Sequence, residues 1–286
     1  MADNSKEAIE LSNGVRMPRM GLGVFKVDPD DVRTVVYKAL GMGYRLVDTA
    51  QAYGNERGVG DAIRASDVPR DQLFVTTKMM RNVGEKDAQA DFERSLGELG
   101  LDYVDLCLVH MPFGDVYGTW RVLERELRRG RVRAIGVSNF DPVRLQDLIS
   151  NAEVAPMVNQ YQSNPYAPAE AVAGFCRMHG IAFQAWGPLG QGKSRLLSDP
   201  VLEGIAQAHG CSVAQAVLAW QLGRGIAVVA KSTHEERLRQ NLEATRFSLT
   251  PEEMLTVSAL AKPEEAGMLD NPAFVAHLCA GWHEDA

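Results

Sequence analysis

Residues 44–66, YRLVDTAQAYGNERGVGDAIRAS, show the pattern that decides the fold. The apolar run at 44–49 is typical of a short buried strand, and 55–66 has the spacing of a helix with an acidic first turn. The same strand-then-helix unit recurs along the whole chain. Strands are expected at 20–25, 44–49, 73–78, 104–110, 133–139, 156–160, 181–186 and 226–232, and helices at 29–43, 55–66, 86–100, 120–130, 142–152, 169–180, 212–225 and 235–246.

Eight such units in 286 residues favour a closed barrel. Short strands rich in Val and Ile fit a sheet buried on both faces, and strict alternation with helices indicates parallel strands. An open doubly wound sheet is the alternative, but no Gly-x-Gly-x-x-Gly follows the first strand. We therefore predict an α/β fold, a (β/α)8 TIM barrel that occupies residues 1–286 as a single domain.

Three additions to the barrel are expected. An N-terminal β-hairpin should turn at Asn13-Gly14, a pair that favours the type I′ turn. An extra helix at 201–210 should precede the seventh barrel helix, and a C-terminal tail should begin at about residue 250.

The composition excludes several classes of protein. A net charge of -7 argues against nucleic-acid binding. The four cysteines show no metal-ligand spacing, so we expect no metal site and no disulfide, with Cys107 a buried, inert thiol. The polar N-terminus and the absence of an 18-residue apolar run predict neither a signal peptide nor a membrane segment, and hence a cytoplasmic protein.

Polar side chains stand where the expected strands end. They are Asp48, Lys78, His110, Ser138, Asn139, Asn159, Gln160, Trp186, Lys231 and Ser232. Asp48 and Ser138 could each be a helix cap, but Lys78, His110, Gln160 and Trp186 are poor helix caps. Because a barrel brings the carboxyl ends of its strands to one mouth, we expect these side chains to form one cluster.

The cluster suits the protonation of a carbonyl oxygen. A lysine beside Tyr53 would lower the phenol's pKa from about 10, and Asp48 would hold Lys78 charged. Tyr53 would then serve as a general acid, while His110 donates a hydrogen bond to the same oxygen. These groups provide no reductant, so a cofactor is implied.

The later strand ends provide a place for that cofactor. Trp186 offers a flat surface for a ring, and Asn139 and Gln160 carry amides that could pair with a carboxamide. The loop GPLGQG at 187–192 could approach a pyrophosphate or could be a plain surface turn. Lys231, Ser232 and Arg237, around a helix start, suit a phosphate or are an ordinary solvated helix start.

Seven motifs together resemble one family. They are GYRLVDTAQAYGNE (43–56), TTK (76–78), DLCLVHMP (105–112), RAIGVSNF (133–140), VNQ (158–160), AWGPLGQG (185–192) and AKSTHEERLRQN (230–241). In this order they resemble the aldo-keto reductases, and within them the bacterial diketogluconate reductase group. The resemblance extends from residue 20 to about 260 and implies NADPH bound on a barrel without a Rossmann fold.

The resemblance also assigns roles to individual residues. The catalytic tetrad would be Asp48, Tyr53, Lys78 and His110. Ser138, Asn139 and Gln160 would hold the nicotinamide carboxamide, Trp186 would stack on the ring, Lys231, Ser232 and Arg237 would hold the 2′-phosphate, and Gln240 and Asn241 would contact adenine. Further cofactor contacts are expected at Val24, Gly187, Leu189, Gln191, Thr233 and His234.

Several positions depart from the family pattern. Met79, Met80 and Met111 stand where relatives often have tryptophan, which predicts a roomier substrate pocket walled by Phe25, Met80 and Met111. Asn164 replaces a familiar histidine, and His234 stands where arginine is common. The tail at 268–286, with Trp282, would help to line the pocket.

We therefore predict an NADPH-dependent reductase of small-molecule aldehydes or ketones, monomeric, with NADH as a weaker alternative. Two rival functions differ in kind. A Schiff-base lyase would use Lys78 as nucleophile, and a non-catalytic NADP(H)-binding subunit would not need the acid at Tyr53.

Overall fold

The computed structural model describes residues 8–80, 82, 84–192, 195–262 and 275–276. Eight parallel strands close into a barrel in the order β10-β3-β4-β5-β6-β7-β8-β9. They are β3 (Met20–Gly23), β4 (Leu46–Asp48), β5 (Phe74–Met79), β6 (Val104–Val109), β7 (Val132–Ser138), β8 (Val158–Gln162), β9 (Ala182–Trp186) and β10 (Ala227–Ala230). The predicted barrel is confirmed; that residues 1–286 form a single domain stays a prediction.

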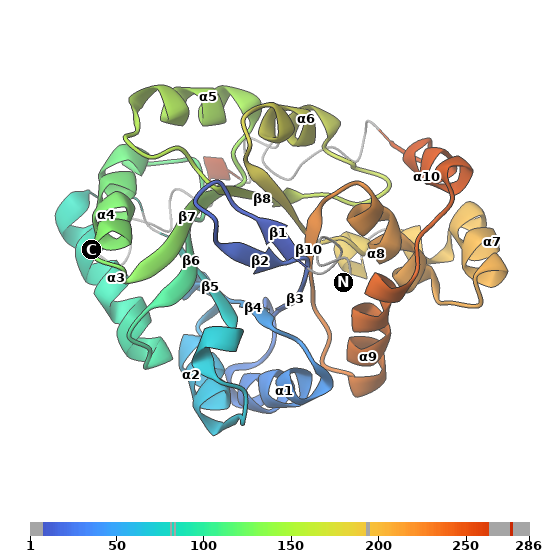
Figure 1. Ribbon diagram of the computed structural model, residues 1–286, viewed down its shortest axis with the longest axis horizontal. Helices are drawn as coiled ribbons and strands as arrows, with labels where there is room; N and C mark the ends of the chain where they lie inside the picture. Colours follow the sequence, from blue (N-terminus) through green and yellow to red (C-terminus); the bar gives the residue numbers. More distant parts are fainter. Residues whose placement is uncertain (1–7, 81, 83, 193–194, 263–274, 277–286) are drawn as a thin grey trace.

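Helices surround the strands (Figure 1). They are α1 (Pro29–Met42), α2 (Glu56–Ala65), α3 (Glu85–Leu99), α4 (Val116–Arg128), α5 (Pro142–Asn151), α6 (Glu170–Met178), α7 (Pro200–Ala208), α8 (Val213–Gly223), α9 (Glu235–Glu243) and α10 (Pro251–Ser258). The extra helix before the seventh barrel helix is α7.

Side-chain caps set several of the helix starts. Asp28, Asp115, Asp141, Asp199, Ser212 and Thr250 each accept a hydrogen bond from a backbone N–H of the first turn. Asp115 explains why α4 begins at Val116, four residues before the expected start. Thr250 and Glu253 form a capping box, so the segment predicted as tail from residue 250 begins with a helix, α10. The tail at 268–286 falls almost entirely outside the described residues.

The predicted N-terminal hairpin is present, but its turn is of another type. β1 (Ala8–Glu10) pairs with β2 (Arg16–Pro18), and the Leu11 N–H donates to the Val15 carbonyl. The loop therefore has three residues, 12–14, of which only Gly14 has a positive φ, at 82°. A type I′ turn needs positive φ at both central residues, so the predicted type I′ turn is wrong.

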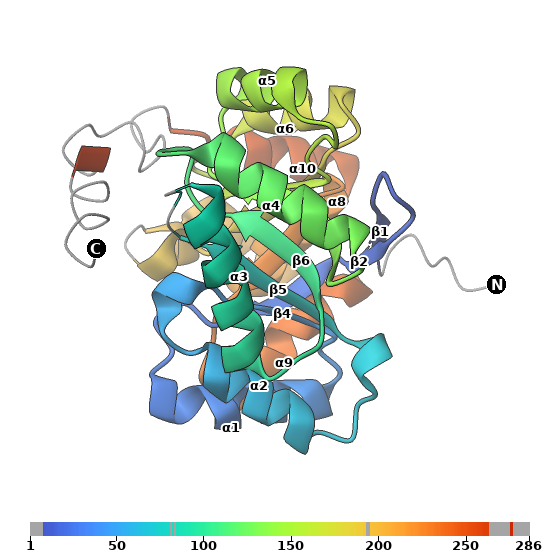
Figure 2. The same ribbon diagram turned by 90° about the vertical axis from the view of Figure 1, so that its left-hand side faces the viewer.

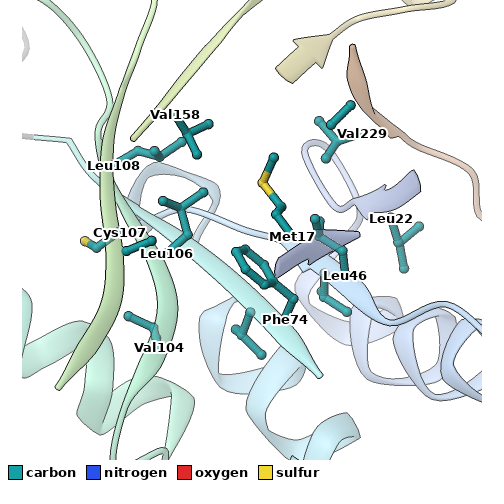
Figure 3. Close-up of a cluster of buried hydrophobic side chains, with 14 of the residues drawn as sticks. Met17, Leu22, Leu46, Phe74, Val104, Leu106, Cys107, Leu108, Val158 and Val229 are labelled. Carbon is teal, nitrogen blue, oxygen red and sulfur yellow. The ribbon is translucent and has the colours of Figure 1, made fainter. Parts of the chain in front are cut away.

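The hairpin closes the amino end of the barrel (Figures 1 and 2). Met17 of β2 is fully buried and lies beside Leu46 and Phe74 of the barrel strands, as Figure 3 shows. Cys107 points to the other side of its strand, is also fully buried, and has a pKa raised by burial, as expected for an inert thiol. With this end filled by apolar side chains, the polar strand ends lie at the opposite, carboxyl end.

Candidate active site

Asp48, Lys78 and Tyr53 meet at the ends of β4 and β5. The Lys78 ammonium is fully buried and donates to Asp48 Oδ1 at 2.6 Å, to the Thr49 carbonyl at 3.0 Å and to the Tyr53 hydroxyl at 3.2 Å. Tyr53 belongs to a short turn, Gln51–Tyr53, that follows β4 directly. Asp48 therefore pairs with Lys78, and Asn55, not Asp48, occupies the N-cap position of α2.

Burial and the neighbouring charges have opposite effects on the pKa values of this group. Burial alone would lower the pKa of Lys78, but Asp48 and then Tyr53 raise it above its ordinary value, so the ammonium stays charged. Burial raises the pKa of Tyr53, and Lys78 counteracts this only in part because Asp48 lies beside it. The expected net lowering of the Tyr53 pKa is therefore wrong, and at neutral pH the phenol keeps its proton.

His110 follows β6 and lies beside the phenol. Its ring and that of Tyr53 are edge to face, with centroids 5.8 Å apart. Burial first, and then the charge of Lys78, lower the pKa of His110 to about 3, so the imidazole is neutral at physiological pH. Its Nδ1 is buried without a hydrogen-bond partner among the described residues. A neutral imidazole here can donate one hydrogen bond without adding charge.

The residues expected to hold a carboxamide form one hydrogen-bonded group. Ser138 Oγ donates to the backbone carbonyl of Gln160 at 3.0 Å, and Asn139 Nδ2 donates to the backbone carbonyl of His110 at 3.0 Å. Trp186 Nε1 donates to Asn139 Oδ1 at 2.9 Å. Asn139 has a φ of 66°, a left-handed conformation that asparagine tolerates better than most residues.

Gln160 joins this group to the charged one. Its Nε2 donates to Asp48 Oδ2 at 2.7 Å, across 112 residues of sequence. Asn159, in contrast, donates to the Phe140 carbonyl and lies against Cys176 of α6, so it does not join the cluster.

The loop 187–192 is rich in left-handed residues. Gly187, Gly190, Gln191 and Gly192 all have φ between 55° and 71°. Left-handed residues in a turn can direct backbone N–H groups into a concave surface that binds anions. Leu189 is half-buried and Gln191 is exposed. This geometry fits the pyrophosphate alternative.

The segment 231–241 offers free positive charge at the start of α9. Lys231 and Arg237 are exposed, and the ion pairs of α9 and the turn after it in the described residues, Lys38–Glu235 and Arg246–Glu243, include neither of them. The Ser232 hydroxyl accepts from the His234 N–H at 3.1 Å, which shapes the entry to the helix. Two unpaired cations beside a helix N-terminus fit a phosphate group.

The other predicted cofactor positions differ in accessibility. Thr233 and His234 are exposed, and Asn241 is buried at 3% exposure. The Gln240 amide donates to Glu236 within the same helix at 3.1 Å. Val24 is buried; its N–H donates to the backbone carbonyl of Asp48, so its backbone lies beside that of Asp48.

The three predicted pocket residues differ in their exposure and in the side chains that they contact. Phe25 is 45% exposed, and its ring centroid is 4.9 Å from that of Tyr53. Met80 is half-buried just after β5, whereas Met111 is 6% exposed with its sulfur 3.5 Å from Asn139 Nδ2. Met79 is fully buried, which identifies it as a packing residue. Asn164, at the familiar histidine position, closes a local turn by accepting from the Tyr166 N–H.

Sequence reasoning missed two buried amides that support the site. Asn55 Nδ2 donates to the carbonyls of Val24 and Val27, which fixes the loop that carries Phe25. Gln184 accepts from Gln160 Nε2 at 2.7 Å. A polar residue in the middle of the apolar run IAFQAW was a signal that could have identified Gln184, because buried polar groups need partners.

Comparison with known proteins bears directly on this site. Residues 19–262 match the aldo/keto reductase family. The chain belongs to this family. The match includes the whole barrel and all four members of the predicted tetrad.

Relatives and solved structures of the same kind match over most of their length. Glyoxal reductase of Bacillus subtilis (strain 168) is 43% identical over 270 residues, 93% of this chain and 97% of that protein. Morphine 6-dehydrogenase of Pseudomonas putida is 40% identical, over 88% and 90% of the two chains. The Bombyx mori aldo-keto reductase in complex with NADP has a TM-score of 0.85 at 33% identity, over 89% and 92%.

Membership in the family establishes the general activity. The protein is an oxidoreductase of the type that acts on small-molecule carbonyl compounds with a nicotinamide cofactor. The relatives above carry other names, so the diketogluconate reductase group stays a prediction. No helix in the described ranges is long and apolar enough to cross a membrane. Nor do three or more His, Cys, Asp and Glu side chains in those ranges gather as a metal site would require.

Proposed function

We propose that this protein reduces aldehydes or ketones to alcohols with NADPH, and that Tyr53 supplies the proton. The observation that carries the proposal is the buried set at the ends of β4 and β5. There a charged ammonium lies 3.2 Å from the Tyr53 hydroxyl and is itself held by a carboxylate at 2.6 Å. A general acid needs such a partner, because the phenolate that it leaves behind must be stabilised.

Each residue of the tetrad has its own role in protonating the carbonyl oxygen of the substrate. Tyr53 keeps its proton at neutral pH and can donate it as negative charge develops on the substrate oxygen. Lys78 stabilises the phenolate that results, and Asp48 keeps Lys78 in place and charged. His110, as a neutral imidazole, donates a hydrogen bond to the same oxygen. NADPH, when bound, supplies the hydride for the carbonyl carbon.

The chain's own residues fit a phosphorylated nicotinamide cofactor. No described residue donates a hydrogen bond to Gln160 Oε1, which leaves an acceptor for a carboxamide N–H. The exposed cations of Lys231 and Arg237 would bind a 2′-phosphate. NADPH carries this group and NADH lacks it. We therefore propose NADPH as the preferred cofactor, with NADH binding more weakly.

The substrate would enter beside Phe25 and Met80. The Phe25 ring is partly exposed and packs against Tyr53. The thioether side chains of Met80 and Met111 can adapt to substrates of different shapes. We therefore propose a pocket that accepts bulky as well as small carbonyl compounds. A monomeric, cytoplasmic enzyme stays our prediction.

The charged state of Lys78 speaks against a Schiff-base lyase. A lysine nucleophile must be neutral to attack a carbonyl carbon, and such lysines have lowered pKa values. Here Asp48 raises the pKa of Lys78. The same arrangement speaks against a purely cofactor-binding subunit, since binding alone requires no acid with a stabilised conjugate base.

The change Tyr53→Phe tests the proposal. It removes the proton donor and leaves the ring in place, so kcat should fall at least about a hundredfold. The dissociation constant for NADPH should stay within about twofold of the wild-type value, because the phenol lies on the substrate side. The control is Tyr37→Phe on α1, whose side chain is 48% exposed. Retention of more than about a tenth of the wild-type turnover by Tyr53→Phe would contradict the assignment.

A further inference from the structure

A chain of polar side chains runs through the barrel interior toward the acid. Gln184, in the middle of β9, is fully buried, and its Oε1 accepts from Gln160 Nε2 at 2.7 Å. The same Nε2 donates to Asp48 Oδ2 at 2.7 Å, while Asp48 Oδ1 accepts from Lys78. At its other end, Gln184 Nε2 lies 3.8 Å from the sulfur of Met17 in the hairpin.

These hydrogen bonds determine whether the NH₂ group or the oxygen of the Gln160 side chain faces Asp48. An ionised carboxylate can only accept, so the NH₂ group and not the oxygen of Gln160 must face Asp48. The second N–H of that group is taken by Gln184. Both donors of Gln160 are therefore occupied, and its Oε1 is the atom left to meet a ligand.

We propose that Gln184 is a positioning residue, which holds Gln160 as a pure hydrogen-bond acceptor toward the cofactor ring. The proposal rests on the proposed function, because it assumes that Gln160 meets the substituent on the nicotinamide ring. A side chain fixed in this way selects a substituent that carries an N–H, such as an amide or thioamide. It discriminates against a methyl ketone, which offers only an acceptor and leaves Gln160 Oε1 without a partner.

The test compares two NADP⁺ analogues that differ only in this substituent. The thionicotinamide analogue keeps the N–H, and the 3-acetylpyridine analogue lacks it. Dissociation constants are measured by quenching of tryptophan fluorescence. The wild-type protein should bind the acetylpyridine analogue about tenfold more weakly, the scale of one buried hydrogen bond left unmade.

One Gln184 variant should lower the ratio of the two dissociation constants, acetylpyridine over thionicotinamide analogue, and another should leave it unchanged. Gln184→Met keeps the volume but leaves the Gln160 NH₂ group held by Asp48 alone. The amide can then turn about that one bond and offer its second N–H to a ketone, so the ratio should fall to about two. Gln184→Glu, whose carboxyl group burial and the nearby Asp48 should keep protonated, retains an acceptor oxygen and should retain the wild-type ratio. Should Gln184→Met not fold, Gln184→Asn withdraws the acceptor by one methylene and serves for the same comparison.

A second buried glutamine provides the control. Gln221 of α8 is also fully buried, but its amide donates to Ser163, outside the predicted cofactor and substrate contacts. Gln221→Met should lower stability and leave the ratio near ten. An unchanged ratio in Gln184→Met, an equal drop in Gln221→Met, or a wild-type ratio near one would overturn the proposal. Failure of the wild-type protein to bind either analogue would instead refute the proposed function.

Discussion

The ion pair between Asp48 and Lys78 should dominate the energetics of the barrel mouth. Their side chains are 4% and 0% exposed, and Nζ and Oδ1 are 2.6 Å apart. With an effective dielectric constant of about 20, two unit charges at this separation attract by about 6 kcal/mol. Lys78→Met leaves Asp48 with the Gln160 amide as its one side-chain donor among the described residues, and Asp48→Asn leaves the Lys78 ammonium with neutral acceptors only. Each change should therefore lower the free energy of unfolding by about 3–5 kcal/mol, the usual cost of breaking a buried pair.

The double variant distinguishes this argument from simple loss of packing. With both changes present no buried charge remains uncompensated, so the combined loss should be smaller than the sum of the single losses by at least about 3 kcal/mol. Urea unfolding at pH 7, followed by circular dichroism and fluorescence, gives these free energies. The comparison holds if the dependence of the unfolding free energy on urea concentration, the m value, is the same for all variants. The matched control is the solvent-exposed pair Arg57–Glu98, whose double-variant cycle should show little coupling. Additive losses at Asp48 and Lys78 would refute the reasoning.

Three further outcomes are expected. The kcat/KM for reduction should stay level from about pH 6 to pH 9 and fall only above about pH 10, because Tyr53 must be protonated and burial raises its pKa; an inflection near pH 7 would contradict this. Arg237→Ala should weaken NADPH binding about tenfold and leave NADH binding little changed, as titration by fluorescence quenching would show; equal losses would argue against a 2′-phosphate contact. Met80→Trp with Met111→Trp should lower kcat/KM for a large aromatic aldehyde relative to glyceraldehyde; an unchanged ratio would make these methionines packing residues.

The barrel and its polar mouth could be predicted because both depend on local pattern. Short apolar strands that end in Asp48, Lys78 or Ser138 reveal the strand directions, and parallel closure then brings these ends together. The capping box at Thr250 and Glu253 is also visible in the sequence as Thr-x-x-Glu, a pattern that predicts a helix start within the expected tail.

Other features depend on contacts that no local pattern contains. The bond from Gln160 to Asp48 spans 112 residues and depends on how the two strands are placed around the barrel. The direction of the Tyr53 pKa shift likewise could not be predicted, since it depends on how burial, Lys78 and Asp48 balance in three dimensions. The hairpin turn was mistaken because Asn13-Gly14 also suits a three-residue loop, in which only Gly14 needs a left-handed backbone.

The hairpin across the amino end has a practical consequence for handling the protein on a solid support. β1 and β2 lie at the end of the barrel away from the strand ends that carry Tyr53 and Lys78 (Figure 2). A linker joined ahead of Ala8 would attach the molecule to a bead or an electrode by this closed end. The mouth would then face the surrounding solution, and dissolved carbonyl compounds could reach it without passing the support.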